Sequence, residues 1–382
     1  MKKTIALLLA VPLALSGLAA AETPDPLRLI AVNVGKADAL LLFSGSDVYL
    51  IDTGTAESWG ALSAALRANG VTALTGVILT HTDKDHIGGL EALACSSIPV
   101  GAWYTSAFCA KEFKDGHPAD IAAASRNQEA ARLKSGDSLP LDRGTLTVLG
   151  PTASSDKENC NSVVLLAEGG GGSMLLAGDM EFPEEEALMA AGLIGGVDVL
   201  KVGNHGESDA TSDAFAALAA PKIAVISTNS VEEPDTPAKR VVKALKRAGA
   251  QLAFTESASG GVEVSLAGGE AKAYLVSWEY PEEARGVVIS GKSGQTDTIS
   301  LTNTGSAAVD LSGWFIRSER GGQVFVFPEG ASLDSGKSLT VSALDSPSAG
   351  DYVWRDKKVW HKSKDDAASL YDAWGRLMAE AD

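Results

Sequence analysis

Residues 80–89 read Thr80-His81-Thr82-Asp83-Lys84-Asp85-His86-Ile87-Gly88-Gly89, and this stretch decides the fold of the chain. It follows an apolar run, residues 76–79, whose length and composition are typical of a buried strand. It precedes residues 90–94, which have the pattern of the first turns of a helix. Four candidate metal ligands therefore lie in one short loop at the end of a core strand.

The spacing of these ligands predicts two metal ions. In an extended loop, residues 81, 83 and 85 point to one side, so His81 and Asp83 can share one ion. Asp85 and His86 are adjacent and diverging, and can serve a second. A polar loop with chance histidines is the competing interpretation, and the flanking strand and helix favour the metal site. An EF-hand that begins at Asp83 is excluded, because its twelfth position would be Ala94.

The same loop resembles a known family. His81-x-Asp83-x-Asp85-His86 followed by two glycines resembles the signature loop of the metallo-β-lactamase superfamily. The aspartate at the third position resembles the variant in the C-terminal domain of ComEC-type competence proteins and their secreted relatives. The likeness extends over roughly residues 27–278. It implies an α+β fold, a four-layer αββα sandwich, and metal-dependent hydrolysis.

The resemblance also assigns two later positions. Asp179 ends a strand and matches the residue that bridges the two ions, although a strand-terminal aspartate can also cap the helix expected near Pro183. His205 matches a ligand of the second ion. The implied metal ligands are His81, Asp83, Asp85, His86, Asp179 and His205, of which Asp85 and His205 are also assigned catalytic roles.

Three departures from the family pattern bear on activity. Asn204 stands where relatives commonly have a histidine, and residues 233–237 lack the usual Gly-His-Pro. Many superfamily members carry a metal-binding histidine near the segment Asn159-Cys160-Asn161-Ser162, which has none. Cys160 can serve as a zinc ligand there, or can be an inert packing residue, which is the commoner case. These departures leave a non-enzymatic protein with a degenerate site as an alternative.

The ligand set indicates which ions would bind. Three histidines and three carboxylates form a harder site than an all-histidine one. We therefore expect two divalent ions, Zn²⁺ or Mn²⁺.

Two segments near the start of the chain support the family likeness. Residues 34–39 resemble the Val-Gly-Gln-Gly-Asp turn of ComEC-type domains. Residues 48–54 form a strand that ends in Asp52-Thr53-Gly54. An aspartic protease is excluded because the tripeptide has no second copy. Further along, residues 122–133 are predicted to be helical.

The first 21 residues have the features of a signal peptide. Lys2 and Lys3 precede an apolar core, residues 5–15, and three alanines precede the expected cleavage site. The apolar run is too short to span a membrane, so we expect a secreted or periplasmic protein without a membrane anchor. In an oxidising compartment, Cys95 and Cys109 are predicted to form a disulfide.

Residues 286–375 contain short strands and turns, as a β-sandwich requires. The segment Val309-Asp310-Leu311-Ser312-Gly313-Trp314 and those after it resemble a lamin-tail domain, which implies an immunoglobulin-like binding module. The predicted division is a signal peptide at 1–21, a hydrolase domain at 22–280 and a lamin-tail-like domain at 281–382. Gly286-x4-Gly291-Lys292-Ser293 has Walker A spacing, but no helix follows, which excludes nucleotide binding.

One stretch of the C-terminal region stands out by its charge. Residues 354–364 carry five cationic side chains and two tryptophans. This combination suits contact with phosphates and bases. The competing interpretation is a solubilising loop with two core tryptophans.

The whole chain is acidic, with a formal net charge of −17. This charge excludes a broad nucleic-acid-coating surface, but not a nuclease, whose metals bring their own positive charge. The leading function is hydrolysis of nucleic-acid phosphodiesters through a metal-bridging hydroxide. Hydrolysis of lactams, lactones or thioesters is the enzymatic alternative, and nucleic-acid or surface binding the non-enzymatic one.

Overall fold

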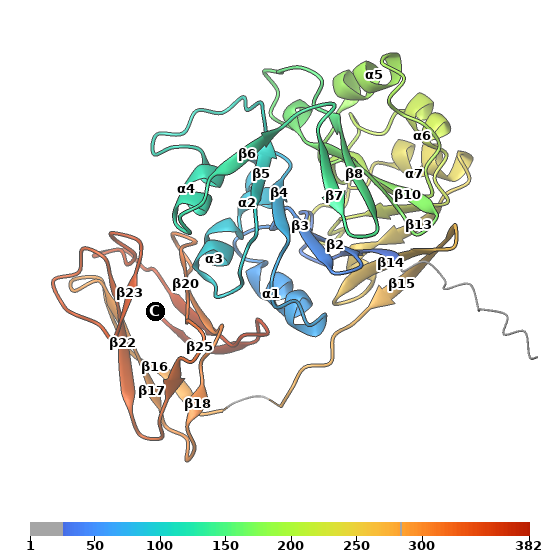
Figure 1. The fold of residues 1–382 in the computed structure, drawn as a ribbon. Coiled ribbons are helices and arrows are strands. Elements are labelled where there is room, and N and C mark those ends of the chain that lie inside the picture. Colours follow the sequence, from blue (N-terminus) through green and yellow to red (C-terminus); the bar gives the residue numbers. More distant parts are fainter. Residues whose placement is uncertain (1–25, 283–284) are drawn as a thin grey trace, which may run out of the picture.

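The computed structural model describes residues 26–282 and 285–382 (Figure 1). The predicted signal peptide lies outside these residues. Within them, no helix has the length and apolar composition needed to cross a membrane.

The first sheet has eight strands in the order β15-β14-β1-β2-β3-β4-β5-β6. Its antiparallel half runs from β15 to β3, and from β3 to β6 the strands are parallel. The strands are β1 (Leu27–Ala31), β2 (Leu40–Ser44), β3 (Asp47–Ile51), β4 (Gly76–Leu79), β5 (Trp103–Ser106), β6 (Ala130–Leu133), β14 (Gly261–Ala267) and β15 (Glu270–Val276).

The second sheet has seven strands in the order β13-β12-β11-β10-β9-β8-β7. It is antiparallel from β7 to β10 and parallel from β10 to β13. The strands are β7 (Ser138–Leu141), β8 (Gly144–Gly150), β9 (Val164–Gly169), β10 (Gly172–Leu176), β11 (Val199–Lys201), β12 (Ile223–Ile226) and β13 (Gln251–Phe254).

The two sheets pack face to face and helices cover their outer faces (Figure 1). Leu29 and Ile78 of the first sheet share one core cluster with Leu165 and Leu176 of the second. This arrangement confirms the predicted αββα sandwich. The helices are α1 (Trp59–Ala68), α2 (Lys84–Ile87), α3 (Leu90–Cys95) and α4 (Pro118–Ala124) beside the first sheet, and α5 (Phe182–Ala190), α6 (Asp213–Ala219) and α7 (Lys239–Arg247) beside the second.

The helix predicted at residues 122–133 is wrong beyond its first residues. Helix α4 ends at Ala124, and Asn127 has a φ of 57°, which breaks the helical path. The chain then enters β6, which pairs in parallel with β5 at the edge of the first sheet. Sheet pairing therefore overrides the local helical pattern.

The C-terminal region is all β, as predicted. Two four-stranded sheets, β16-β17-β22-β23 and β20-β19-β24-β25, enclose a separate core, and β18 pairs with β21 beside them. The strands are β16 (Val287–Ser293), β17 (Thr298–Asn303), β18 (Val309–Asp310), β19 (Phe315–Ser318), β20 (Val324–Val326), β21 (Ser332–Leu333), β22 (Ser338–Ala343), β23 (Tyr352–Trp354), β24 (Ala368–Tyr371) and β25 (Leu377–Ala381).

The two tryptophans of residues 354–364 belong to this core. Trp354 and Trp360 are 2% and 5% exposed, and their rings meet edge to face with centroids 5.6 Å apart. Neither ring is available to stack on a base. The interpretation as core tryptophans is therefore the correct one.

The sandwich packs against the helices of the first sheet (Figure 1). Phe315 and Val326 are buried in the same cluster as residues of α1 and α3. The hydroxyl of Ser63 in α1 donates a hydrogen bond of 2.8 Å to the carbonyl of Ala373. Apolar contact and hydrogen bonding thus hold the two parts of the chain together.

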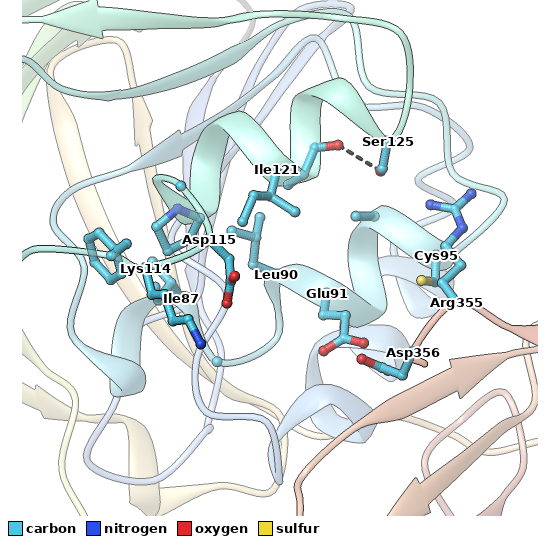
Figure 2. Close-up of a pocket in the computed structure, with 16 residues that line it drawn as sticks. Ile87, Leu90, Glu91, Cys95, Lys114, Asp115, Ile121, Ser125, Arg355 and Asp356 are labelled. Atoms are coloured by element: carbon cyan, nitrogen blue, oxygen red, sulfur yellow. Dashed lines mark hydrogen bonds between the residues drawn. The ribbon is translucent and has the colours of Figure 1, made fainter. Parts of the chain in front are cut away.

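The predicted disulfide is wrong, because all three cysteines are free thiols. Cys95 ends α3 and lines a cavity of 570 Å³ between the first sheet's helices and the sandwich, near Arg355 (Figure 2). Cys109 lies elsewhere, with its Sγ 3.5 Å from Oε1 of Glu158. The two thiols therefore have different neighbours, a separation that chain spacing does not reveal.

We predict that Cys95 reacts slowly with alkylating reagents. Burial raises the pKa of the Cys95 thiol to about 11, and only the thiolate reacts. At pH 8 its thiolate fraction is on the order of 100-fold below that of an ordinary thiol. Timed labelling with iodoacetamide and peptide mapping should show this difference, and the rate should rise with pH. Urea-unfolded protein is the control, and a Cys95–Cys109 disulfide peptide would contradict the structure.

Candidate metal centre

The signature loop connects β4 to α3, and its glycines set its path. A Cβ at Gly88 would lie 2.4 Å from the backbone nitrogen of Ala56, and one at Gly89 would lie 2.5 Å from the carbonyl oxygen of Thr53. Only glycine therefore lets the loop pack against the segment that follows β3. This contact holds the candidate ligands over the carboxyl ends of β3 and β4.

Asp85 and His86 converge instead of diverging as predicted. The short helix α2 begins at Lys84, directly after the extended residue Asp83. This turn brings Oδ2 of Asp85 to 3.9 Å from Nε2 of His86. Both side chains therefore face the same centre.

Asp179 lies in the middle of this centre. It follows β10, and its Oδ2 is 3.2 Å from Nε2 of His86 and 3.8 Å from Nε2 of His81. Its Oδ1 is 3.5 Å from Nε2 of His205. Helix α5 has Glu181 at its N-cap, so the alternative that Asp179 caps this helix is wrong.

His205 reaches the centre from the loop after β11. Asn204 and His205 have φ values of 43° and 52°, in the left-handed region that non-glycine residues rarely adopt. This backbone places Nε2 of His205 3.4 Å from Oδ2 of Asp85. Strained residues of this kind concentrate at functional sites.

All six predicted residues lie together, but they divide into a compact group and two flanking residues. Asp85, His86, Asp179 and His205 each offer a ligand atom, and these atoms lie within 4.8 Å of one another. His81 and Asp83 lie beside this group, with Nε2 and Oδ2 3.7 Å apart. The ammonium of Lys111 also contacts Asp83.

The group fits a divalent cation on two counts. First, the Nε2 atoms of His81, His86 and His205 and Oδ1 of Asp179 are buried without a hydrogen-bond partner. Such orphaned polar atoms are costly, and a cation would satisfy them. Second, donors at ~2.1 Å from a tetrahedral zinc ion lie about 3.4 Å from one another. The separations from Asp179 to His86, from Asp179 to His205 and from His205 to Asp85 are 3.2–3.5 Å, close to this value, and that from Asp85 to His86 is 3.9 Å.

The charges of the ligands also favour a cation. Burial alone would lower the pKa of His205, but the carboxylates of Asp179 and Asp85 outweigh it and raise the pKa to about 9. Burial would likewise raise the pKa of Asp179, but His86 and His205 hold it well below its usual value. The carboxylates therefore stabilise positive charge at this centre.

A second layer of residues orients the ligands, and sequence reasoning gave it no role. Asp52 accepts hydrogen bonds of 2.7 Å from both the amide and the hydroxyl of Thr80. Its Oδ2 is also 2.7 Å from Nδ1 of His86, which turns Nε2 of His86 toward Asp179. Asp52 was visible only as the first residue of an Asp-Thr-Gly tripeptide at a strand end.

A buried ion pair lies beside His205 and acts on it through charge, without a hydrogen bond. Lys201 of β11 is fully buried, and its Nζ donates a hydrogen bond of 2.7 Å to Oδ2 of Asp38. The other oxygen of Asp38 is 3.8 Å from Nδ1 of His205. A lysine within the apolar run of residues 197–202 was the only sequence signal for this pair.

Cys160 is not part of the centre. Its thiol is buried, with Sγ 4.0 Å from Oε2 of Glu181, and burial raises its pKa. The packing interpretation is therefore correct. Asn204, at the other departure from the family pattern, directs its amide to Oδ1 of Asp209 at 3.3 Å.

Comparison with known proteins identifies two regions. The model of the metallo-beta-lactamase superfamily matches residues 32–230, and that of the lamin tail domain matches residues 283–382. The chain is 31% identical over 237 residues to ComE operon protein 3 of Bacillus subtilis, covering 56% of this chain and 30% of that protein. It is 28% identical over 246 residues to competence protein ComA of Neisseria gonorrhoeae, covering 63% of this chain and 32% of that protein.

The chain thus spans about a third of the length of these two relatives. Among solved structures, the metallo-beta-lactamase fold protein YhfI from Bacillus subtilis matches with a TM-score of 0.42 and 15% identity, covering 63% of this chain and 99% of that one.

We predict that Asp179→Ala removes most of the bound metal, because Asp179 contacts all three imidazoles. Elemental analysis of purified protein should give up to two ions per chain before the substitution. Asp213→Asn, at an exposed carboxylate paired only with Arg247, is the matched control and should keep its metal. Full retention of metal in Asp179→Ala would contradict the assignment.

We also predict that Lys201→Met is strongly destabilising. It leaves the buried carboxylate of Asp38 without its partner, a loss of about 3–5 kcal/mol in the free energy of unfolding. Lys222→Met is the matched control, because Lys222 pairs with Asp198 while 61% of its side chain is exposed. Such an exposed pair contributes about 0–1 kcal/mol. Urea denaturation measures both, and equal losses would show that the buried pair is not required.

Proposed function

We propose that this chain, which belongs to the metallo-beta-lactamase superfamily of metal-dependent hydrolases and carries a lamin tail domain, is an exported two-metal phosphodiesterase that acts on nucleic acid. The observation that carries the proposal is the convergence of three histidines and three carboxylates, Asp83, Asp85 and Asp179, at one place. Export is inferred from the sequence of residues 1–21 alone.

The ligands divide between two ions. Asp85, His86 and His205 would hold one ion and His81 and Asp83 the other, with Asp179 available to both. This mixture of nitrogen and oxygen donors suits Zn²⁺ or Mn²⁺. When bound, the ions supply Lewis-acid activation of a phosphoryl group and of a water molecule.

The histidines of the centre are buried, and two of its aspartates are partly exposed at the surface. The side chains of His81, His86 and His205 are at most 1% exposed, whereas those of Asp83 and Asp85 are 32% and 34% exposed. An incoming substrate therefore meets the carboxylates first. The imidazoles beneath them are shielded from water, and hydrogen bonds at Nδ1 orient the rings of His81 and His86.

Asp85 is the residue best placed to orient the attacking water. Burial would raise the pKa of its carboxyl, but His205 and His86 outweigh burial and lower it. Asp85 is therefore ionised at neutral pH and can accept a hydrogen bond from the attacking water. Such a group contributes to catalysis by orienting the nucleophile.

Two lines of support point to a nucleic-acid substrate. The relative from Neisseria gonorrhoeae is named competence protein ComA, and a third relative, from Haemophilus influenzae, is named recombination protein 2. A two-metal site also offsets the repulsion between a polyanionic substrate and a chain of net charge −17. Since the chain spans only part of each relative, its activity is inferred from its own site.

We predict that Asp85→Ala lowers cleavage of single-stranded DNA by at least ~100-fold, the typical contribution of a positioned acid–base group. The assay uses metal-loaded protein recovered from the periplasm or medium, with Asp213→Asn as control. Nitrocefin and a lactone are tested in parallel. Turnover of either without any cleavage of DNA or RNA would favour the alternative hydrolase, and no turnover at all would favour a binding protein.

A further inference from the structure

A groove of 700 Å³ opens directly beside the metal centre, within the size range of ligand sites, ~300–1,000 Å³. One wall is Asp85 with its neighbours in α2, and residues 55–57 continue it. The opposite wall is residues 319–322, the turn between β19 and β20 of the sandwich. The C-terminal region therefore forms part of the surroundings of the site.

The turn is held firmly in this place. Phe315 of β19 and Val326 of β20 are buried in the core cluster shared with α1 and α3. Within the turn, the amide of Arg320 donates to Oδ1 of Asp366 at 3.2 Å, and the hydroxyl of Ser318 donates to the same oxygen at 2.9 Å. The backbone at Arg320 is thus held in place, which fixes the point from which its side chain extends.

The cations of the groove differ in whether they are already paired. Lys36 binds Glu207 and Glu233 at 2.6 and 2.8 Å, so its charge is compensated. Lys84 and Arg320 are exposed, and neither side chain has an ion-pair partner among residues 26–282 and 285–382. These two side chains are therefore the ones free to bind an incoming anion.

Most acidic residues at the groove are already paired or belong to the metal centre, so they do not compensate the charges of Lys84 and Arg320. Glu319 is paired with Arg317, and Glu233 with Lys36. Asp85 belongs to the metal centre. Glu57 is the carboxylate that faces the groove without an ion pair in the described part of the chain. Two unpaired cations, one from each part of the chain, thus stand against one unpaired carboxylate.

We infer that the groove binds the nucleic-acid strand next to the bond being cleaved, and that Arg320 and Lys84 contact phosphates flanking that bond. This inference rests on the proposed function. Arginine presents a planar fork that matches phosphate geometry, and lysine a compact charge. The lamin tail domain then acts as a wall of the substrate groove and favours polymeric substrates over small diesters.

The test compares Arg320→Ala and Lys84→Ala with Lys337→Ala, which removes an exposed cation from the β21–β22 turn of the same sandwich. KM is measured on a single-stranded oligonucleotide and on bis(p-nitrophenyl) phosphate, which has no flanking phosphate. For Arg320→Ala, KM should rise about tenfold more on the oligonucleotide than on the small diester. The slope of log KM against log salt concentration should weaken by about 0.7, as for one lost phosphate contact.

The outcomes separate the inference from the proposed function. If Arg320→Ala and Lys84→Ala match Lys337→Ala on both substrates while the unsubstituted protein cleaves them, the groove assignment is overturned and the function stands. If no protein cleaves either substrate, the function fails. Fluorescence anisotropy of a labelled oligonucleotide with Asp85→Ala then decides the groove: weaker binding after Arg320→Ala supports it, and unchanged or absent binding overturns it.

Discussion

The structure depends on the carboxylate of Asp179, which is buried among three imidazoles at the end of β10. A buried charge is tolerated only where opposite charge and hydrogen bonds compensate it. Here the loop after β4 and the loop after β11 bring His81, His86 and His205 to the same point from both sheets. The need to compensate the buried charge of Asp179 therefore explains why the two loops meet at this edge of the sandwich.

This requirement extends one layer outward. Asp52 holds His86 through its Nδ1, and Asp38 lies against His205 while paired with the buried Lys201. The hydrogen bond to Asp52 fixes which nitrogen of His86 faces the centre, and the charge of Asp38 favours a positive His205. The left-handed backbone at Asn204 and His205 belongs to the same arrangement, since it aims the ring at Asp85 and Asp179. The ligands are thus pre-positioned for a cation.

The sequence was informative where the chemistry is local. The signature loop with its flanking strand and helix lies within residues 76–94, so this local pattern predicted the fold family and four of the six converging residues. Asp179 and His205 lie far along the chain, and the family resemblance assigned them. Contacts between residues that lie far apart in the chain could not be predicted. Whether Lys201 pairs with Asp38, or whether Cys95 forms a disulfide with Cys109, depends on how strands and helices far apart in the chain pack together. Residues 130–133 became an edge strand because β5 offered a partner, which no local pattern specifies.

In the C-terminal sandwich, too, the local sequence did not indicate which segment lies beside the metal centre. Its resemblance to a lamin-tail domain implied a binding module, and residues 354–364 drew attention because they combine basic and aromatic side chains. Their tryptophans are core residues, whereas the turn at 319–322, plain in sequence, lies beside Asp85. A module on a flexible tether would only raise the local concentration of substrate. Because β19 and β20 share a buried cluster with α1 and α3, this sandwich presents its turn at a fixed position instead. Under the proposed function, the metal centre and this turn therefore act together as one substrate-binding surface.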